Sequence, residues 1–119
     1  MRSVTLCCLA FAPLSALLAQ EPALVEAVAP ILMTEDRRVL DPGVLIPALE
    51  HPDPAVRRVA VLAIGRIGNG DGVLLLVPRL RDREPAVVTE TIFAIGLLKD
   101  SRGITPLLDR LRQIGRAHV

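Results

Sequence analysis

The chain repeats itself with a fixed period. Leu45–Leu75 and Leu76–Pro106 align as two copies of one 31-residue unit, LIPALEHPDPAVRRVAVLAIGRIGNGDGVLL over LVPRLRDREPAVVTETIFAIGLLKDSRGITP. Ten of the 31 columns are identical: Leu45/Leu76, Pro47/Pro78, Leu49/Leu80, Pro54/Pro85, Ala55/Ala86, Val56/Val87, Ala63/Ala94, Ile64/Ile95, Gly65/Gly96 and Gly72/Gly103. A period of this length is typical of a solenoid, in which each unit buries its apolar face only against its neighbours.

The apolar residues are almost all aliphatic. Hydrophobic residues make up 51% of the chain and aromatic residues only 2%, with no Trp and no Tyr. This composition suits thin layers of closely packed helices and argues against a stacking platform for nucleic-acid bases, which needs aromatic faces. The net charge is +1 and no stretch is strongly basic. A phosphate-binding footprint is therefore not indicated, and we expect no nucleic-acid partner.

The N-terminus has the layout of an export signal. Arg2 gives a positive start, residues 4–18 carry no charge, and Ala19 is a small residue before a polar pair. We expect a secretory signal peptide over residues 1–19, cleaved after Ala19. The alternative is an uncleaved membrane anchor, but a bilayer span needs about 18 or more apolar residues. The uncharged run is shorter than this and contains Pro13.

Both cysteines of the chain, Cys7 and Cys8, lie inside that signal. After cleavage no thiol remains, which excludes disulfides, thiolate metal sites and cysteine nucleophiles. We expect the mature protein to be exported, periplasmic or extracellular, free of the membrane, and stabilised by packing alone.

Acidic residues followed by proline mark the helix starts. Asp41-Pro42 and Asp53-Pro54 each combine an N-cap with a first-turn proline, and Glu84-Pro85 restarts the chain in the second copy. Asp71 and Ser101 are two further expected caps. Apolar residues recur at helical spacing after these starts, and no segment alternates as a strand does. Pro30 is expected to kink or split the first helix. The predicted helices span residues 22–34, 41–50, 54–67, 72–81, 85–98 and 103–112.

The motifs DPAVRR at 53–58 and AIGRIG at 63–68 resemble those of HEAT-like repeats. They are most similar to the short bacterial version first associated with phycobilin lyases, with its D-P-x-V-R-x-x-A start and A-L-G-x-I-G finish. The resemblance covers about residues 41–112. It implies an all-α, right-handed α-solenoid of helix pairs whose second helices line a concave surface. Such repeats serve scaffolds, regulators and lyases alike, so the motif is weak for function.

The predicted organisation follows from this register. It comprises a signal peptide at 1–19, an N-terminal helix and charged linker at 20–40, and HEAT-like repeats at 41–71 and 72–100, followed by the first helix of a third repeat at 101–112 and a tail at 113–119. The tail QIGRAHV keeps only Ala117 of the repeat pattern and resembles the translation of a sequencing-adapter oligonucleotide. We expect the natural chain to continue after Arg112. A frayed natural terminus is the alternative.

No residue pattern indicates catalysis, a cofactor or a metal. His51 precedes a proline in a turn, and Asp53 and Asp71 are expected caps. Arg57 lies four residues after Asp53, so we expect these two side chains to pair across the first turn. The carboxylates at 35–36 are expected to be solvated. The glycine-rich run 68–72 follows a helix and lacks the strand and lysine of a phosphate loop.

A candidate partner-binding surface lies on the second helices. Glu90 occupies the column of Val59, either as a rim residue with its carboxylate in water or as a polar spot on the inner surface. Leu62 and Phe93 share a neighbouring column, either as core or as exposed contacts for a partner. The candidate surface is Arg58, Leu62, Thr89, Glu90 and Phe93.

We expect an exported scaffold that binds proteins or peptides, with its oligomeric state left open. The alternative comes from a second resemblance. The order of export signal, a short helix containing residues 31–38 and HEAT-like units is similar to long exported bacterial proteins that end in a cyclophilin-type peptidyl-prolyl isomerase domain. That implies an isomerase whose catalytic domain lies outside these 119 residues. A phycobilin lyase is less consistent with an export signal.

Overall fold

The computed structural model describes residues 14–117, with side chains from Pro22 onward. The expected signal peptide falls mostly outside this range, as do both cysteines and the last two residues of the tail. The elements are α1 (Leu14–Asp36), α2 (Pro42–Leu49), α3 (Pro54–Ile67), α4 (Gly72–Leu76), the 3-10 helix η1 (Val77–Arg81), α5 (Pro85–Leu98), the 3-10 helix η2 (Ser101–Gly103) and α6 (Ile104–Ala117). No strand occurs in the described range, as the periodicity predicts.

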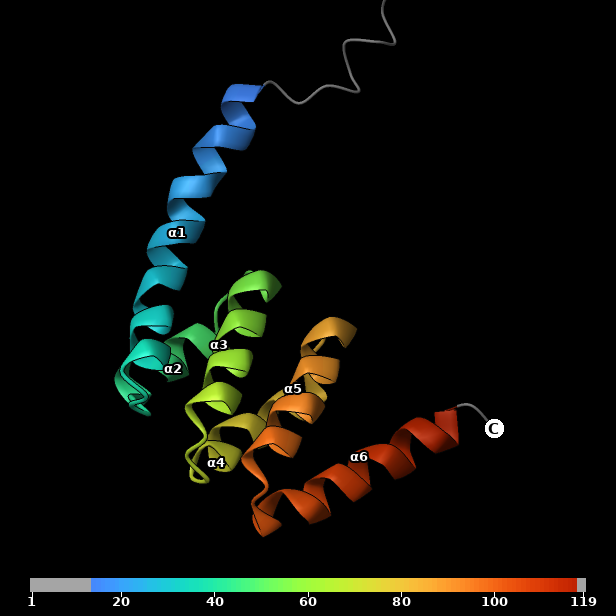
Figure 1. Cartoon of the computed structure of the whole chain (residues 1–119). Helices are drawn as coiled ribbons and strands as arrows, with labels where there is room; N and C mark the ends of the chain where they lie inside the picture. Colours follow the sequence, from blue (N-terminus) through green and yellow to red (C-terminus); the bar gives the residue numbers. More distant parts are fainter. Residues whose placement is uncertain (1–13, 118–119) are drawn as a thin grey trace, which may run out of the picture.

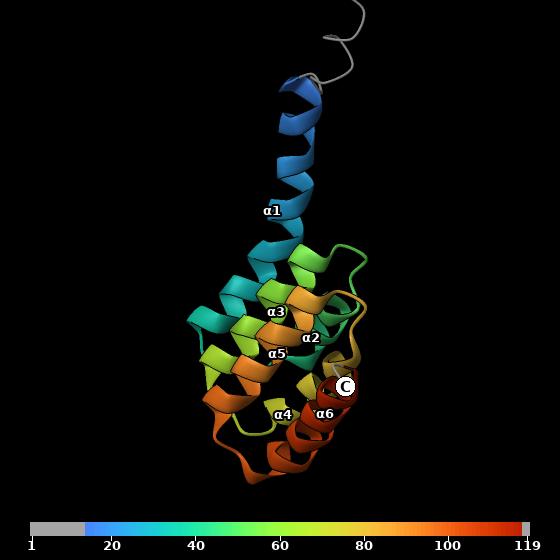
Figure 2. The same cartoon turned by 90° about the vertical axis from the view of Figure 1, so that its right-hand side faces the viewer.

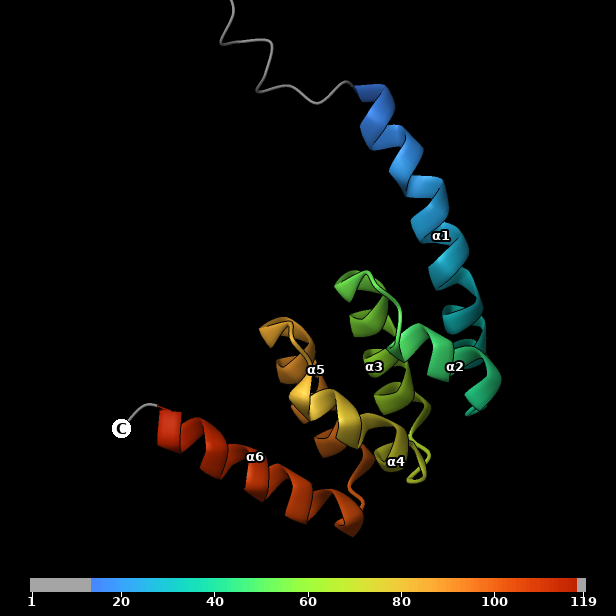
Figure 3. The ribbon, with the colours of Figure 1, turned by 180° about the vertical axis from the view of Figure 1, so that it is seen from behind.

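The helices form a row of pairs (Figure 1). α3 lies in the middle of the inner layer, packed against α1 on one side and α5 on the other. α2 packs against α3, and η1 packs against α5 (Figure 2). Each 31-residue unit is thus one outer helix followed by one inner helix. The N-terminal part of α1 projects beyond the other helices in all views (Figures 1 to 3).

Aspartates provide most of the helix caps. Asp41 Oδ1 accepts a hydrogen bond from Gly43 N–H at 2.9 Å, and Asp53 Oδ1 accepts one from Ala55 N–H at 2.9 Å, so both predicted caps are confirmed. Each bond satisfies one free donor of the first turn. The predicted caps Asp71 and Ser101 are wrong. Asp71 makes no cap bond, and Asp100 provides the cap of η2.

The hydrophobic core lies between the two layers. Its fully buried members come from the predicted apolar stripes of both units, and the helix bounds of α3 and α5 agree with the prediction. Val59 of α3 is only partly buried against this core. The largest fully buried side chains are Ile31, Leu45, Val56, Val61, Ile64, Val73, Leu76, Val87 and Thr91.

Three predicted helices differ in the structure. α1 is one helix from Leu14 to Asp36 that contains both Pro22 and Pro30, so the expected split is absent. Pro30 lies on the exposed side, where water can satisfy the carbonyl that its missing N–H leaves free. The predicted helix 72–81 divides into α4 and η1, with Pro78 in the 3-10 part. α6 continues to Ala117 and has no buried residue.

A buried ion pair joins the two units, and it corrects the expected partner of Arg57. The guanidinium does not bind Asp53, whose carboxylate is used as a cap. It donates from Nε and Nη2 to the two carboxylate oxygens of Asp82, each at 3.0 Å. Arg79 Nη1 also approaches Asp82, at 3.5 Å, and donates to the carbonyl of Leu49 at 2.8 Å. The helix-start turns of both units are thereby tied together.

A second cross-link joins the turns at the opposite end of the helix pairs. Arg102 Nη1 lies 3.1 Å from Asp71 Oδ1, and Arg102 Nη2 lies 2.8 Å from Asp100 Oδ2. The side-chain and backbone hydrogen bonds from Arg102 lower the pKa of Asp100 to about 2. The hydrogen bonds to Asp100 and Asp71 in turn raise the pKa of Arg102. All three groups are solvated, so this link orders the turns more than it stabilises the fold.

Candidate functional surface

The inner helices α1, α3 and α5 form one continuous face, which we call the inner face. Figure 2 shows the three helices side by side. Each of them has exposed side chains. All five candidate residues belong to α3 or α5. Arg58 and Thr89 occupy equivalent positions of the 31-residue repeat, and so do Leu62 and Phe93. α3 and α5 therefore contribute matching positions to this face.

Arg58 and Glu90 meet across α3 and α5. Arg58 Nη2 lies 3.1 Å from Glu90 Oε1, and the two side chains are 47% and 24% exposed. Glu90 is therefore a half-buried rim residue that is neutralised by the neighbouring unit. Thr89 is exposed, and its hydroxyl donates to the carbonyl of Pro85 one turn earlier at 3.1 Å. Thr89 consequently has less hydrogen-bonding capacity to offer a partner than the sequence suggests.

The two apolar candidates differ in exposure. Phe93 is 57% exposed, so the interpretation of this column as core is wrong for α5. Leu62, in the same column of α3, is partly buried. The difference arises because α3 has a neighbour on both sides, whereas α5 has one only on the α3 side among the described residues. Phe93 is an exposed aromatic side chain, the kind that commonly anchors a protein contact.

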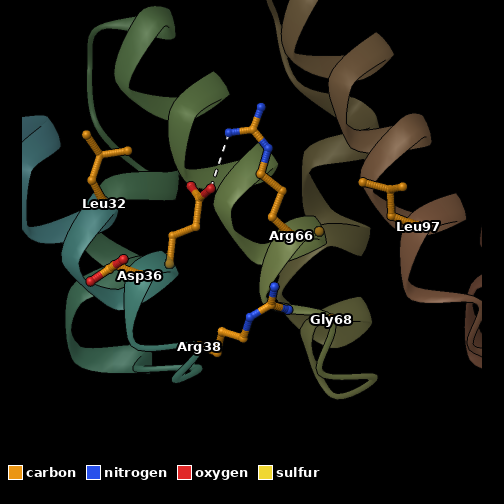
Figure 4. A pocket seen from close by; sticks show the side chains of 8 residues that line it. Leu32, Asp36, Arg38, Arg66, Gly68 and Leu97 are labelled. Atoms are coloured by element: carbon orange, nitrogen blue, oxygen red, sulfur yellow. Dashed lines mark hydrogen bonds and ion pairs between the residues drawn. The ribbon is translucent and has the colours of Figure 1, made fainter.

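A hollow of about 860 Å³ opens on the same face, near the C-terminal ends of the inner helices (Figure 4). Leu32 of α1 and Leu97 of α5 stand on opposite sides of it, 48% and 41% exposed. Its lining is Leu32, Glu35, Asp36, Arg38, Gly65, Arg66, Gly68 and Leu97. Two apolar walls with charged groups between them fit a protein or peptide segment better than a small molecule, because the hollow is wide and open.

An ion pair crosses this hollow. Arg66 Nη1 of α3 lies 3.3 Å from Glu35 Oε1 of α1, as the dashed line in Figure 4 marks. The sequence suggested that Glu35 is a freely solvated carboxylate. The structure instead pairs it with Arg66. The inner face therefore carries two ion pairs, Arg66–Glu35 and Arg58–Glu90, and each joins two neighbouring inner helices. The exposed leucines and Phe93 lie on the same helices.

Sequence reasoning missed Leu32, Leu97, Glu35 and Arg66 as parts of this face. Leu97 occupies the column of Arg66, so an apolar residue replaces a cation at an outward position. That exchange was the signal that could have identified it. The contribution of α1 could not be found in the same way, because α1 lies before the two aligned copies.

No group of three or more His, Cys, Asp or Glu side chains converges as a metal site would in the described part of the chain. His51 lies in the turn between α2 and α3, where its Nδ1 accepts a hydrogen bond from Asp53 N–H at 3.0 Å. None of the helices described over residues 14–117 is long and apolar enough to span a membrane.

Comparison with known proteins gives one match. The family model described as HEAT repeats matches residues 43–114, which is more than half of the chain. The matched range begins in α2 and ends in α6, so it includes nearly all of the first helix pair and the whole of the second. The searches of curated proteins and of solved structures gave no significant match.

Proposed function

Because the chain belongs to the HEAT-repeat family, we propose that it is a scaffold that binds a protein or peptide segment on its inner face. The observation that carries the proposal is the exposed apolar group formed by Leu32 on α1 and by Phe93 and Leu97 on α5, the two inner helices on either side of α3. Exposed apolar side chains that cluster beside a hollow commonly mark interaction sites. The two ion pairs on the same face would supply polar contacts to the partner between these apolar side chains.

The experiment compares Phe93→Ser with a matched control. Leu74, on the outer helix α4, is 62% exposed and lies outside the inner face, so Leu74→Ser removes a similar apolar side chain elsewhere. A peptide selected from a random library on the purified protein is labelled and titrated by fluorescence anisotropy. We expect Phe93→Ser to weaken binding at least about tenfold, because exposed aromatic anchors dominate such contacts. Binding that depends on Leu74 and not on Phe93 would contradict the proposal.

Export is a separate part of the proposal. The positive start at Arg2, the uncharged run 4–18 and Ala19 support cleavage and release into the periplasm or the medium. The mass of the protein recovered from the periplasm of a bacterial host tests it. We expect a species that begins at Gln20, and an intact N-terminus in the membrane fraction would instead indicate an anchor.

A second candidate function rests on the resemblance to exported HEAT-repeat proteins with a cyclophilin-type domain. In that case, the inner face would hold substrates or partners for a peptidyl-prolyl isomerase domain encoded after Arg112. The short motifs DPAVRR and AIGRIG support the bacterial repeat type but not a lyase reaction. Sequencing the gene beyond codon 112 separates the two functions. Cyclophilin motifs there support the isomerase, and further repeats followed by a stop codon support the scaffold alone.

A further inference from the structure

The central inner helix presents a row of two arginines and a leucine. Arg58, Leu62 and Arg66 of α3 are spaced four positions apart, so they lie along one side of the helix. Both arginines are exposed and Leu62 is partly buried. At a rise of about 1.5 Å per residue, the two arginines start about 12 Å apart along the helix axis. The inner face therefore carries two cationic groups with an apolar side chain between them.

In both ion pairs of the inner face, the arginine is the more exposed partner. The side chain of Arg66 is 58% exposed and that of Glu35 is 23% exposed. The Arg58–Glu90 pair has the same asymmetry, at 47% and 24%. The carboxylates are the less accessible groups, so a partner that approaches this face meets the guanidinium groups first.

Each guanidinium keeps donors for a further acceptor. Arg58 donates from Nη2 to Glu90 at 3.1 Å, and Arg66 donates from Nη1 to Glu35 at 3.3 Å. Within the residues that the structure describes, these are the only hydrogen bonds of the two arginine side chains. A guanidinium carries several N–H donors in a planar fork that matches a carboxylate. Both arginines can therefore bind a second carboxylate without releasing the first.

A third guanidinium lies at the hollow between α1 and α3. Figure 4 shows Arg38, just after α1, extending toward Gly68 at the C-terminal end of α3. The carboxylate of Asp36 points away from Arg66 in the same view. The charged groups that face α3 in this hollow are therefore two guanidinium groups and the carboxylate of Glu35, which is already paired.

Exposed apolar side chains flank the arginine row on both sides. Phe93 and Leu97 of α5 lie on one side, and Leu32 of α1 stands across the hollow on the other. Leu97 rests against α3, because its Cδ1 would lie 3.3 Å from a Cβ atom added to Gly65. A partner that pairs with the arginines must therefore bury apolar atoms as well.

We propose that the inner face binds an acidic protein segment whose carboxylates pair with Arg58 and Arg66 and whose apolar side chains pack against the flanking leucines and Phe93. The assignment rests on the proposed function, because it names the chemistry of the partner for the same face. Carboxylates and guanidinium groups form directed bidentate pairs. Apolar groups on both sides strengthen such pairs, because they keep water away from the charges.

A nucleic acid is the other polyanion that arginines could bind, and it fits this face less well. The net charge of the chain is only +1, and an aromatic content of 2% leaves few faces on which bases could stack. The exposed side chains beside the arginines are mainly leucines. This combination of a few cations with aliphatic contacts favours a peptide.

Two random peptide libraries test the charge of the partner. Both use peptides of the same length and the same apolar and neutral residues. One contains Asp and Glu as its only charged residues, and the other contains Lys and Arg. We expect the full chain to enrich the acidic library at least about tenfold over the basic one, because complementary charge decides between otherwise equal partners.

Substitutions with effects of opposite sign then test the arginine row. The best acidic peptide is labelled with fluorescein and titrated by fluorescence anisotropy. We expect Arg66→Gln to weaken binding at least about fivefold. Glu35→Gln should strengthen it about twofold or more, because the glutamine competes less for the guanidinium. If the ion pair served only to order the helices, both variants would change binding in the same direction.

Arg112→Gln is the matched control, because Arg112 is exposed on α6 and lies outside the inner face. It should change the affinity less than about twofold. Circular dichroism verifies that all variants remain folded. Arg58→Gln provides an independent second test of the row and should weaken binding in the same direction as Arg66→Gln.

Three results would overturn the acidic partner. The first is enrichment of the basic library, or of neither library. The second is an acidic peptide that binds Arg66→Gln and Arg112→Gln equally well. The third is tighter, arginine-dependent binding of a labelled oligothymidylate, since the partner would then be a nucleic acid. Peptide binding that depends on Phe93 but not on charge would exclude the acidic partner and leave the proposed function standing.

Discussion

Arg57 and Asp82, which lie 25 positions apart in the sequence, form a bidentate ion pair. Nε and Nη2 of Arg57 donate to Oδ2 and Oδ1 of Asp82, both at 3.0 Å. The side chains are 6% and 3% exposed. The remaining donor group, Arg57 Nη1, binds the carbonyls of His51 and Pro52 at 2.7 and 3.0 Å. One arginine thereby fixes the turn before α3 and links it to the turn before α5.

Replacing Arg57 by alanine should cost about 3–5 kcal/mol of unfolding free energy. The reason is that Asp82 would stay buried with only the more distant Arg79 as a cationic partner. Urea unfolding followed by circular dichroism measures the loss. The neighbouring Arg58→Ala is the control, because the Arg58–Glu90 pair is solvated and should contribute about 0–1 kcal/mol. Similar losses for the two variants would contradict the role assigned to Arg57.

The stability of the fold should fall in acid through Asp82. Burial by itself raises the pKa of this carboxyl, but the hydrogen bonds from Arg57 and from Glu84 N–H outweigh it and hold the pKa below 3.8. A group with a lowered pKa in the fold stabilises fully above its unfolded value of about 3.8. That contribution disappears as the pH falls through the lower folded value.

Melting temperatures between about pH 7 and 2 test this relationship. We expect the melting temperature of the unchanged chain to decrease below about pH 4, and Asp82→Asn to show a lower and flatter profile over the same range. Asp100→Asn serves as the comparison, because Asp100 also has a lowered pKa but is solvated. An acid profile that is unaffected by Asp82→Asn would disprove this assignment.

The equivalent glycines should respond to alanine with opposite signs. Gly65→Ala places a methyl group 3.0 Å from Ala94, which forces α3 and α5 apart and should destabilise by about 1–3 kcal/mol. Gly96→Ala meets no atom within 4 Å and should stabilise by up to about 1 kcal/mol through helix propensity. Thermal or urea unfolding distinguishes the two. Stabilisation by both variants would show that α3 and α5 are less closely packed than described.

Ala63→Phe should unfold the repeats or lower their melting temperature strongly. Ala63 is 0% exposed between the layers, and a large side chain there overpacks the core at a cost of about 1–3 kcal/mol or more. The adjacent Leu62→Phe is the matched control, because the same column already holds Phe93 on α5. An unchanged thermal melt for Ala63→Phe would argue against the packing of α3.

The period and the first-turn prolines made α3 and α5 predictable to the residue, because apolar spacing and a proline at the helix start act locally. The partner of Arg57 was not predictable in the same way. Asp53, four residues away, is the local choice, but its carboxylate is used by the Ala55 N–H. Asp82 becomes available only when α5 packs against α3 and brings the two turns together. Similarly, Phe93 and Leu62 share a column. Phe93 is more exposed than Leu62 because its helix has fewer neighbouring helices.

The sequence by itself determined the helix pairs, their length and the repeat register, because these depend on the order of apolar, capping and small residues along the chain. Only the tertiary structure decided which equivalent positions are covered. Gly65 and Gly96 are the same residue in the same local sequence, yet one supports a neighbouring helix and the other faces open space. The burial of a residue depends on whether a neighbouring helix packs against it. The sequence of a repeat carries no local information about the position of that repeat in the stack.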